Sequence, residues 1–324
     1  MAMLEVQDLM VEFRTPDGVV PAVRGVSFRV ERGETVGLVG ESGSGKSATA
    51  LALMRLIPSP PGRITGGTVC LDGEDLLRKS EREMQKIRGR RMAMVFQDPF
   101  SALNPTMTLG EQVAEPIWLH TGVSRHEARA RALRLLQAVH LPEPELRYRQ
   151  YPHQVSGGQR QRVMIAMAFA GDPELLIADE PTTALDVTVQ AQVLALMQEM
   201  QQRARTGILL ITHDLSIVAQ VCDRVLVMYA GQIVESGLVE PIFRAPKHPY
   251  TQGLLASLPD FQTVQQEGRR LISIPGQPPD LAALPAGCPF YPRCGQRREG
   301  VCDRVEPRAV EVAPHQTVQC HLYA

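Results

Sequence analysis

The hydrophobic pattern changes character along the chain, and each change predicts a different kind of element. Near the start, apolar residues alternate with polar ones over 4–6 and 26–30, which is typical of half-buried strands in an antiparallel sheet. An apolar stretch over 34–40 predicts a buried strand, and residues 46–57 predict a helix that ends before Pro58. The chain therefore opens with antiparallel strands and then forms a strand–helix unit.

Further along, the pattern predicts helices first and then alternating helices and strands. Residues 96–155 are helical in character, and Arg125–His140 is their clearest amphipathic helix. The elements expected after this segment are a helix from Gln159, a strand over 175–178, a helix over 187–203, a strand over 208–212 and a hairpin over 225–235 that turns at Ala230-Gly231. Strands that alternate with helices predict an α/β fold whose mostly parallel sheet is covered on both faces.

The composition changes after residue 240, where prolines and cysteines are concentrated. We expect a C-terminal region with little regular structure, held by something other than a large apolar core. The predicted organisation is a domain over 1–240, with an inserted helical subdomain over about 96–158, and a small irregular C-terminal appendage over 241–324.

The amino-acid composition and net charge exclude several classes of protein. The chain has 324 residues, of which 44% are hydrophobic, and its formal net charge is −1. A core of ordinary size is therefore expected, and the near-zero charge argues against binding nucleic acid by general attraction to phosphates. No apolar stretch is long enough for a membrane-spanning helix, and Glu5 and Asp8 interrupt any secretory signal. We therefore expect a chain that stays in the cytoplasm.

One motif between a predicted strand and a predicted helix points to phosphate binding. It matches G-x-x-x-x-G-K-[ST], and the residues expected to bind ATP are Gly40, Glu41, Ser42, Gly43, Ser44, Gly45, Lys46 and Ser47. Glycines allow backbone N–H groups to wrap a phosphate, and the helix N-terminus adds positive potential. Lys46 would lie at the outer phosphates, and the Ser47 hydroxyl would complete a Mg²⁺ shell.

A pair of carboxylates follows a later predicted strand. Asp179, at the end of that strand, is placed to bind Mg²⁺ through water, and Glu180 can orient or deprotonate an attacking water. Together with the phosphate loop, this pair predicts hydrolysis of a nucleoside triphosphate.

A second anion site is expected at the start of another helix. Ser156 is a good N-cap, and Gly157 and Gly158 expose backbone N–H groups before Gln159. Either the chain binds two ligands, or this site completes a nucleotide site on another subunit.

The order and spacing of these motifs resemble those of ABC transporter ATPase subunits. The matching residues are the phosphate loop at 40–47, the Q-loop at Phe96–Pro99, the signature at 156–159, Asp179-Glu180, Ala184-Leu-Asp and His213. The resemblance implies a P-loop NTPase cassette over residues 1 to about 240. It also implies head-to-tail dimers in which Ser156, Gly157, Gly158 and Gln159 of one cassette cap the γ-phosphate held by Lys46 of the other.

The resemblance also assigns roles to single residues. Gln97 would join Mg²⁺ and the attacking water to the membrane partner, Asp186 would communicate across the dimer, and His213 would hold the γ-phosphate and the water. The implied catalytic set is Glu180, His213 and Gln97, and the implied Mg²⁺ set is Ser47, Gln97 and Asp179. Phe13 resembles the aromatic residue that stacks on adenine, although it can equally be a core residue.

Residues after 240 resemble one branch of that family, the oligopeptide/dipeptide importer ATPases. The motifs are Ile242–Thr251 and Gly287–Cys294, in which His248 and Tyr250 are interpreted as packing residues. The branch implies a peripheral protein at the cytoplasmic face of a bacterial inner membrane. Its implied partners are a second cassette, two membrane permease subunits and a periplasmic binding protein. Nickel chelates, glutathione or oligosaccharides are alternative cargoes, and a soluble ABC-type ATPase or a regulatory ATP-binding subunit are the competing classes.

Four of the six cysteines lie in the C-terminal region, namely Cys288, Cys294, Cys302 and Cys320. Disulfides are disfavoured in the cytoplasm, so four thiolates in a proline-rich segment suggest a metal that staples the region together. Zinc and a [4Fe–4S] cluster both accept four cysteines, and four unligated thiols are the alternative. The family resemblance favours the [4Fe–4S] cluster, in a structural role.

Overall fold

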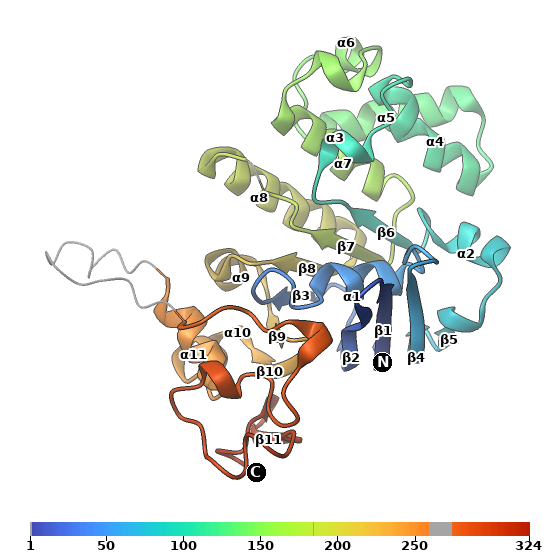
Figure 1. Cartoon of the computed structure of the whole chain (residues 1–324). Helices are drawn as coiled ribbons and strands as arrows, with labels where there is room; N and C mark the ends of the chain where they lie inside the picture. The colour runs from blue at the N-terminus through green and yellow to red at the C-terminus, as the bar shows by residue number, and fades with distance from the viewer. Residues whose placement is uncertain (1, 184, 259–273) are drawn as a thin grey trace, which may run out of the picture. The chain divides into compact units, whose positions relative to one another are not determined.

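The computed structural model describes residues 2–183, 185–258 and 274–324. The backbone divides into two compact units (Figure 1). The first unit contains residues up to 4, 29–35 and 70–211, and the second contains residues 5–28, 36–69 and 212–324. Ala184 of the predicted Ala-Leu-Asp motif, and part of the predicted C-terminal region, lie outside the described residues.

The centre of the first unit is a parallel sheet with the strand order β8-β7-β6. These strands span Gly207–Thr212, Leu175–Asp179 and Met92–Val95, and every residue in them is buried. Continuous burial is expected for parallel strands that are covered on both faces. The predicted parallel sheet is thereby confirmed.

Helices form most of the remainder of this unit, as the sequence predicts for residues 96–155. Thr108 and Ser156 begin α4 (Leu109–Thr121) and α7 (Gly157–Phe169) with reciprocal capping boxes, and α4 packs against α5 (Arg125–Ala138) and α7. In sequence order the elements around the sheet are β5 (Glu74–Asp75), η1 (Leu76–Arg78), α2 (Glu81–Ile87), α3 (Pro99–Ala102), α4 (Leu109–Thr121), α5 (Arg125–Ala138), α6 (Pro144–Tyr148), η2 (Pro152–Gln154), α7 (Gly157–Phe169) and α8 (Val187–Ala204).

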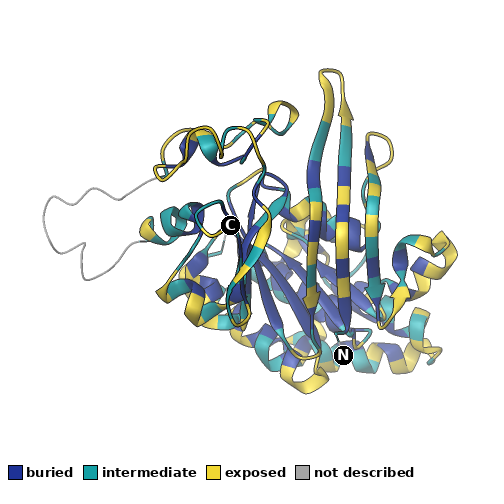
Figure 2. Cartoon of the chain, turned by 90° about the horizontal axis from the view of Figure 1, so that it is seen from below, coloured by how far each residue is buried: buried dark blue, intermediate teal, exposed yellow. Residues whose placement is uncertain are grey.

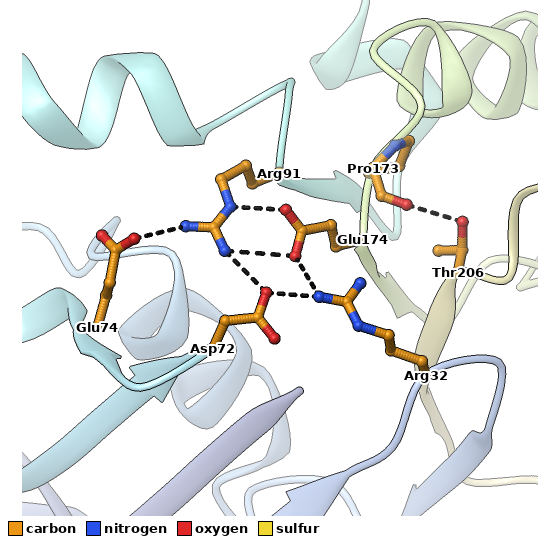
Figure 3. A network of polar contacts seen from close by, with 7 residues as sticks. All are labelled: Arg32, Asp72, Glu74, Arg91, Pro173, Glu174 and Thr206. Carbon is orange, nitrogen blue, oxygen red and sulfur yellow. Dashed lines mark hydrogen bonds and ion pairs between the residues drawn. The ribbon is translucent and has the colours of Figure 1, made fainter. Parts of the chain in front are cut away.

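A network of charged side chains lies at the beginning of β6 and β7 (Figure 3). Arg91 donates to Glu174 at 2.6 Å and to Asp72 at 3.0 Å, and Arg32 donates to the same two carboxylates. Burial alone would raise the pKa of Glu174, but the hydrogen bond and charge of Arg91 outweigh it and lower that pKa to about 2. Since Arg91 and Glu174 directly precede adjacent strands, the network fixes where the two strands begin.

The second unit contains the antiparallel strands predicted at the N-terminus. Strands β1 (Leu4–Thr15) and β2 (Gly18–Val30) form a long hairpin, and β4 (Gly62–Leu71) pairs with the other edge of β1. Figure 2 shows buried and exposed residues that alternate along these strands, as expected for a sheet with one face in the core.

Five further strands of this unit are hydrogen-bonded in the order β11-β12-β10-β9-β3. Strand β3 (Thr35–Val39) is parallel to β9 (Arg224–Tyr229), which forms the predicted hairpin with β10 (Gln232–Leu238) through Ala230 and Gly231. Helix α1 spans Lys46–Leu53 and ends before the predicted residue 57, because Arg55 adopts a left-handed conformation with φ of 51°. Helix α9 (Leu215–Val221) precedes β9.

The C-terminal region corrects one expectation, since it shares a large apolar core with the strands of this unit. Tyr250 and Phe290 pack in the same cluster of buried residues as Val39, Val227 and Tyr229. Regular elements lie both before and within the cysteine-containing stretch, and β12 pairs with β10. These elements are α10 (Val239–Arg244), α11 (Pro249–Ala256), η3 (Leu281–Ala283), η4 (Tyr291–Arg293), β11 (Ala309–Ala313) and β12 (Gln316–Gln319).

Candidate functional site

The phosphate loop lies between β3 and α1, as the sequence predicts. Gly45 caps α1 with φ of 105°, a conformation in which a side chain is strained, and a Cβ atom on Gly45 would meet the carbonyl oxygen of Ala22. A Cβ atom on Gly40 would likewise meet the carbonyl oxygen of Met228. The backbone of this loop therefore requires glycine where the motif has it.

Lys46 is buried, and its ammonium group bridges the loop. Its Nζ donates to the carbonyl oxygens of Gly40 at 2.8 Å and Glu41 at 2.9 Å. Ser47 follows it in the first turn of α1, and the carbonyl oxygen of Ser44 accepts a hydrogen bond from the N–H of Gly231 at 2.9 Å. These contacts hold the loop curled around the start of the helix, where backbone N–H groups favour an anion.

The end of β7 presents the predicted pair of carboxylates in the first unit. Asp179 is the last, buried residue of the strand, and Glu180 follows it in a left-handed conformation with φ of 46°. The Glu180 carboxylate accepts hydrogen bonds from Gln97 Nε2 and from Thr183 Oγ1, each at 2.9 Å. The structure thus brings Gln97 to Glu180, and it adds Thr183, which the sequence reasoning missed although it lies three residues away.

Such backbone strain in a residue other than glycine costs on the order of 1–3 kcal/mol and is concentrated at functional sites. The two hydrogen bonds fix the direction of the Glu180 carboxylate, as a group that orients an attacking water requires.

The signature residues begin α7 as predicted. The Ser156 side chain accepts from the N–H of Gln159 at 3.3 Å, and the Gln159 side chain accepts from the N–H of Ser156 at 3.1 Å. A Cβ atom on Gly157 would meet nothing within 4 Å, so this turn faces open space. The N–H groups of Gly157 and Gly158 therefore start the helix at an accessible end, which suits an anion.

The remaining predicted residues occupy different settings. Asp186 is the N-cap of α8 and accepts from the N–H of Val189 at 2.9 Å. His213 is exposed directly after β8. Phe13 is half-buried in β1 beside Gly62, so its stacking on adenine stays a prediction. The roles of Asp186 and His213, and the Mg²⁺ set of Ser47, Gln97 and Asp179, also stay predictions.

Two residues near the phosphate loop were not expected there. Arg293 forms an ion pair with Glu41, and the Tyr250 hydroxyl accepts a hydrogen bond from the N–H of Glu41. Tyr250 and His248 are fully buried, as their interpretation as packing residues requires, and burial lowers the pKa of His248 to about 3. The hydrogen bond from Glu41 shows that Tyr250 also holds the phosphate loop. No local sequence pattern could predict this contact, because the two residues are 209 positions apart.

The four C-terminal cysteines do not fit the predicted [4Fe–4S] cluster. In the part of the chain that the structure describes, no group of three or more His, Cys, Asp or Glu side chains is arranged to hold a metal ion. Burial, together with the charge of the neighbouring cysteines, raises the pKa of Cys288 to about 11 and also raises the pKa values of Cys294 and Cys320. None of the six cysteines forms a disulfide in the described residues, and the prediction of a metal staple is not supported.

Comparison with known families gives two matches along the chain. Residues 23–183 match the ABC transporter family, and residues 234–302 match the C-terminal region of oligopeptide/dipeptide transporters. Among the described residues, no helix has both the length and the apolar character to span a membrane.

Individual proteins extend these matches over nearly the whole chain. The oligopeptide transport ATP-binding protein OppD of Bacillus subtilis is 54% identical, with 89% of this chain and 80% of that protein covered. The dipeptide transport ATP-binding protein DppD of the same organism is 50% identical, with 98% and 94% covered. The ATP-binding cassette MJ0796, solved as a post-hydrolysis dimer with ADP and Pi, aligns with a TM-score of 0.66 and 29% identity over 73% of this chain and 99% of that one. With the phosphate loop, the carboxylate pair and the capped signature helix all in place, the chain is an ABC-type ATPase and belongs to the family of ATP-binding subunits of oligopeptide and dipeptide transporters.

Proposed function

We propose that this ATPase energises the import of di- and oligopeptides across a bacterial inner membrane, as a peripheral subunit on its cytoplasmic face. The observation that carries the hydrolytic part is the Glu180 carboxylate, held in a strained backbone position by Gln97 and Thr183. Glu180 would orient the attacking water, while Lys46 and Ser47 would bind the phosphates and Mg²⁺. Bound Mg²⁺ would neutralise charge on the phosphates.

The partners proposed for this chain are a second cassette, two permease subunits and a periplasmic binding protein. The accessible start of α7 supports the cassette pairing, because it offers N–H groups to a nucleotide on another subunit. Gln97 and the segment 96–158 would pass the motion of hydrolysis to the permeases. The proposed organisation is a nucleotide-binding domain over 1–240 and a C-terminal region over 241–324, which the separate matches to 23–183 and 234–302 support.

Hydrolysis is tested by Glu180→Gln in the transporter purified through a tag on this chain. We expect kcat to fall by a factor on the order of 10²–10⁴, with ATP still bound, because the variant keeps the shape of the side chain and loses its basicity. Glu5→Gln, at an exposed residue of β1, is the matched control and should leave kcat unchanged. Unchanged hydrolysis in Glu180→Gln would remove the assigned role.

The identity of the cargo is tested with the same purified transporter, reconstituted in vesicles together with its binding protein. Short peptides should stimulate ATP hydrolysis and accumulate inside the vesicles. Stimulation by a nickel chelate, glutathione or an oligosaccharide instead would keep the importer and change its cargo. Purification of this chain with ribosomes or DNA, and without permeases, would contradict the importer.

The proposed function requires no metal at the four cysteines. The metal content of this region is tested by assaying iron, acid-labile sulfide and zinc in the anaerobically purified chain. Four iron and four sulfide per chain would restore the [4Fe–4S] prediction, and one zinc per chain would establish the alternative metal.

A further inference from the structure

The phosphate loop is held from outside by the C-terminal region of the same unit. Arg293 donates to both oxygens of the Glu41 carboxylate, from Nη1 at 2.6 Å and from Nη2 at 2.9 Å. The Arg293 side chain is 5% exposed and that of Glu41 is 26% exposed. Such a paired and largely buried contact is strong and directional.

Arg293 is fixed by its own surroundings as well as by Glu41. Its Nε donates to the carbonyl oxygen of Pro275 at 2.9 Å, and its Nη1 lies 3.4 Å from the hydroxyl of Tyr229. Its guanidinium also lies over the rings of Tyr229 and Phe290, at 5.9 and 6.0 Å from their centroids. The position of this cation is therefore set by the fold of the C-terminal region before any ligand binds.

Tyr250 holds the backbone of the same loop residue. Its hydroxyl accepts a hydrogen bond from the N–H of Glu41 at 2.8 Å, and its ring packs on that of Tyr229 with centroids 4.6 Å apart. The carbonyl oxygen of Glu41 accepts from Lys46 Nζ at 2.9 Å. The N–H, carbonyl and carboxylate of Glu41 are thus all engaged, the first and last by the C-terminal region and the second by the phosphate-binding lysine.

The chemistry of Glu41 explains why these contacts matter. A carboxylate inside a loop that binds phosphates repels the ligand, and a nearby cation removes most of that repulsion. A loop whose N–H groups are already oriented also avoids the cost of ordering when the ligand binds.

We propose that Arg293 and Tyr250 are positioning residues for ATP, through which the C-terminal region sets the affinity of the phosphate loop. Arg293 neutralises the Glu41 carboxylate, and Tyr250 fixes the loop backbone that carries Lys46. The inference rests on the proposed binding of ATP and adds that this affinity depends on residues outside the nucleotide-binding motifs.

The test compares variants in the purified transporter, with kcat and KM for ATP and the binding of a fluorescent ATP analogue as readouts. Arg293→Gln should raise KM and the dissociation constant about tenfold, and change kcat less than about twofold, because one charge is left unneutralised. Adding Glu41→Gln to Arg293→Gln should bring KM back to within about threefold of wild type, since the repulsion goes with the carboxylate. Arg297→Gln is the matched control, because Arg297 lies over the Tyr291 ring and is exposed.

A KM for ATP in Arg293→Gln equal to that of the control would overturn the proposal. A KM in the double variant as high as that of Arg293→Gln alone would also overturn it. Tyr250→Phe should raise KM severalfold, since it loses only the hydrogen bond to Glu41. If Arg293→Gln does not fold, Tyr250→Phe decides alone, and an unchanged KM in it overturns the proposal. If the wild-type complex does not hydrolyse ATP, the proposed function fails. The affinity of the variants for the fluorescent ATP analogue would still test the role of Arg293 and Tyr250 in that case.

Discussion

Arg91→Met is the most informative test of how the first unit is held together. The substitution keeps much of the side-chain volume and removes the guanidinium that joins Glu174, Asp72 and Glu74 (Figure 3). Glu74 would keep its ion pair with Lys79, and the carboxylates of Asp72 and Glu174 would share Arg32 alone. Their mutual repulsion would act at the point where β6 and β7 begin.

The expected loss of stability in Arg91→Met depends on how deeply the charged network is buried. Arg91 is 23% exposed and Glu174 is 26% exposed, so this contact lies between a buried and a surface ion pair. Hydrogen bonds to charged groups contribute about 1.5–3 kcal/mol, and exposed pairs contribute less than about 1 kcal/mol. We therefore expect the free energy of unfolding to fall by about 2 kcal/mol at pH 7, and the urea midpoint to fall by about 0.5–1 M.

The stability difference between wild type and Arg91→Met should change with pH in a definite direction. The pKa of Glu174 is lowered in the folded chain to about 2, from an ordinary value of 4.5. A carboxylate with a lowered pKa stabilises the fold above its unfolded pKa and loses that contribution as the pH falls through its folded pKa. The difference between wild type and Arg91→Met should therefore be complete above about pH 5 and should shrink between about pH 4.5 and 2.

The assay is urea unfolding of the full chain followed by circular dichroism. Arg131→Met is the matched control, since Arg131 forms a single exposed pair with Glu127 on α5 and should cost at most about 0.5 kcal/mol. If Arg91→Met loses no more stability than Arg131→Met, the network does not hold the strands. A loss that stays constant down to pH 2 would show that packing, and not charge, is responsible.

Three further changes test other parts of the fold. Ser156→Ala removes the cap of α7 and should cost about 1 kcal/mol in urea unfolding; unchanged stability would mean that the capping box contributes nothing. Gly110→Ala places a methyl group against the Tyr148 ring and should cost about 1–3 kcal/mol, as calorimetry would show, and an unshifted Tm would contradict this packing. Truncation after residue 240 uncovers Tyr229 and should give a chain that binds a hydrophobic dye; a soluble, cooperatively folded fragment would refute the shared core.

Elements specified by neighbouring residues were predictable from the sequence. The phosphate loop, the N-cap at Ser156 and the turn at Ala230-Gly231 each depend on a few consecutive residues, and the structure has all three as predicted. Helix α1 was predicted too long, because its apolar pattern continues past Leu53 while the backbone turns at Arg55.

Contacts between distant segments could not be predicted in the same way. Tyr250 and Phe290 lie in a proline-rich region without periodicity, and they are buried against strands that occur much earlier in the sequence. The ion pair of Arg293 with Glu41 joins residues separated by 252 positions, and neither residue type is unusual where it stands. The phosphate-binding chemistry of the loop was therefore predictable from the sequence, whereas the contacts of the C-terminal region that hold the loop were not.

The position of β12 in the sheet has a consequence for the order in which the chain can fold. Strand β10 pairs with β9 on one edge and with β12 on the other, and β12 comprises residues 316–319 of a 324-residue chain. During synthesis the second edge of β10 thus lacks its partner until residues 316–319 have been added. An unpaired edge recruits strands from other chains. Completion of this sheet requires synthesis up to β12, and chains released before residue 316 would leave the ribosome with an edge prone to aggregation.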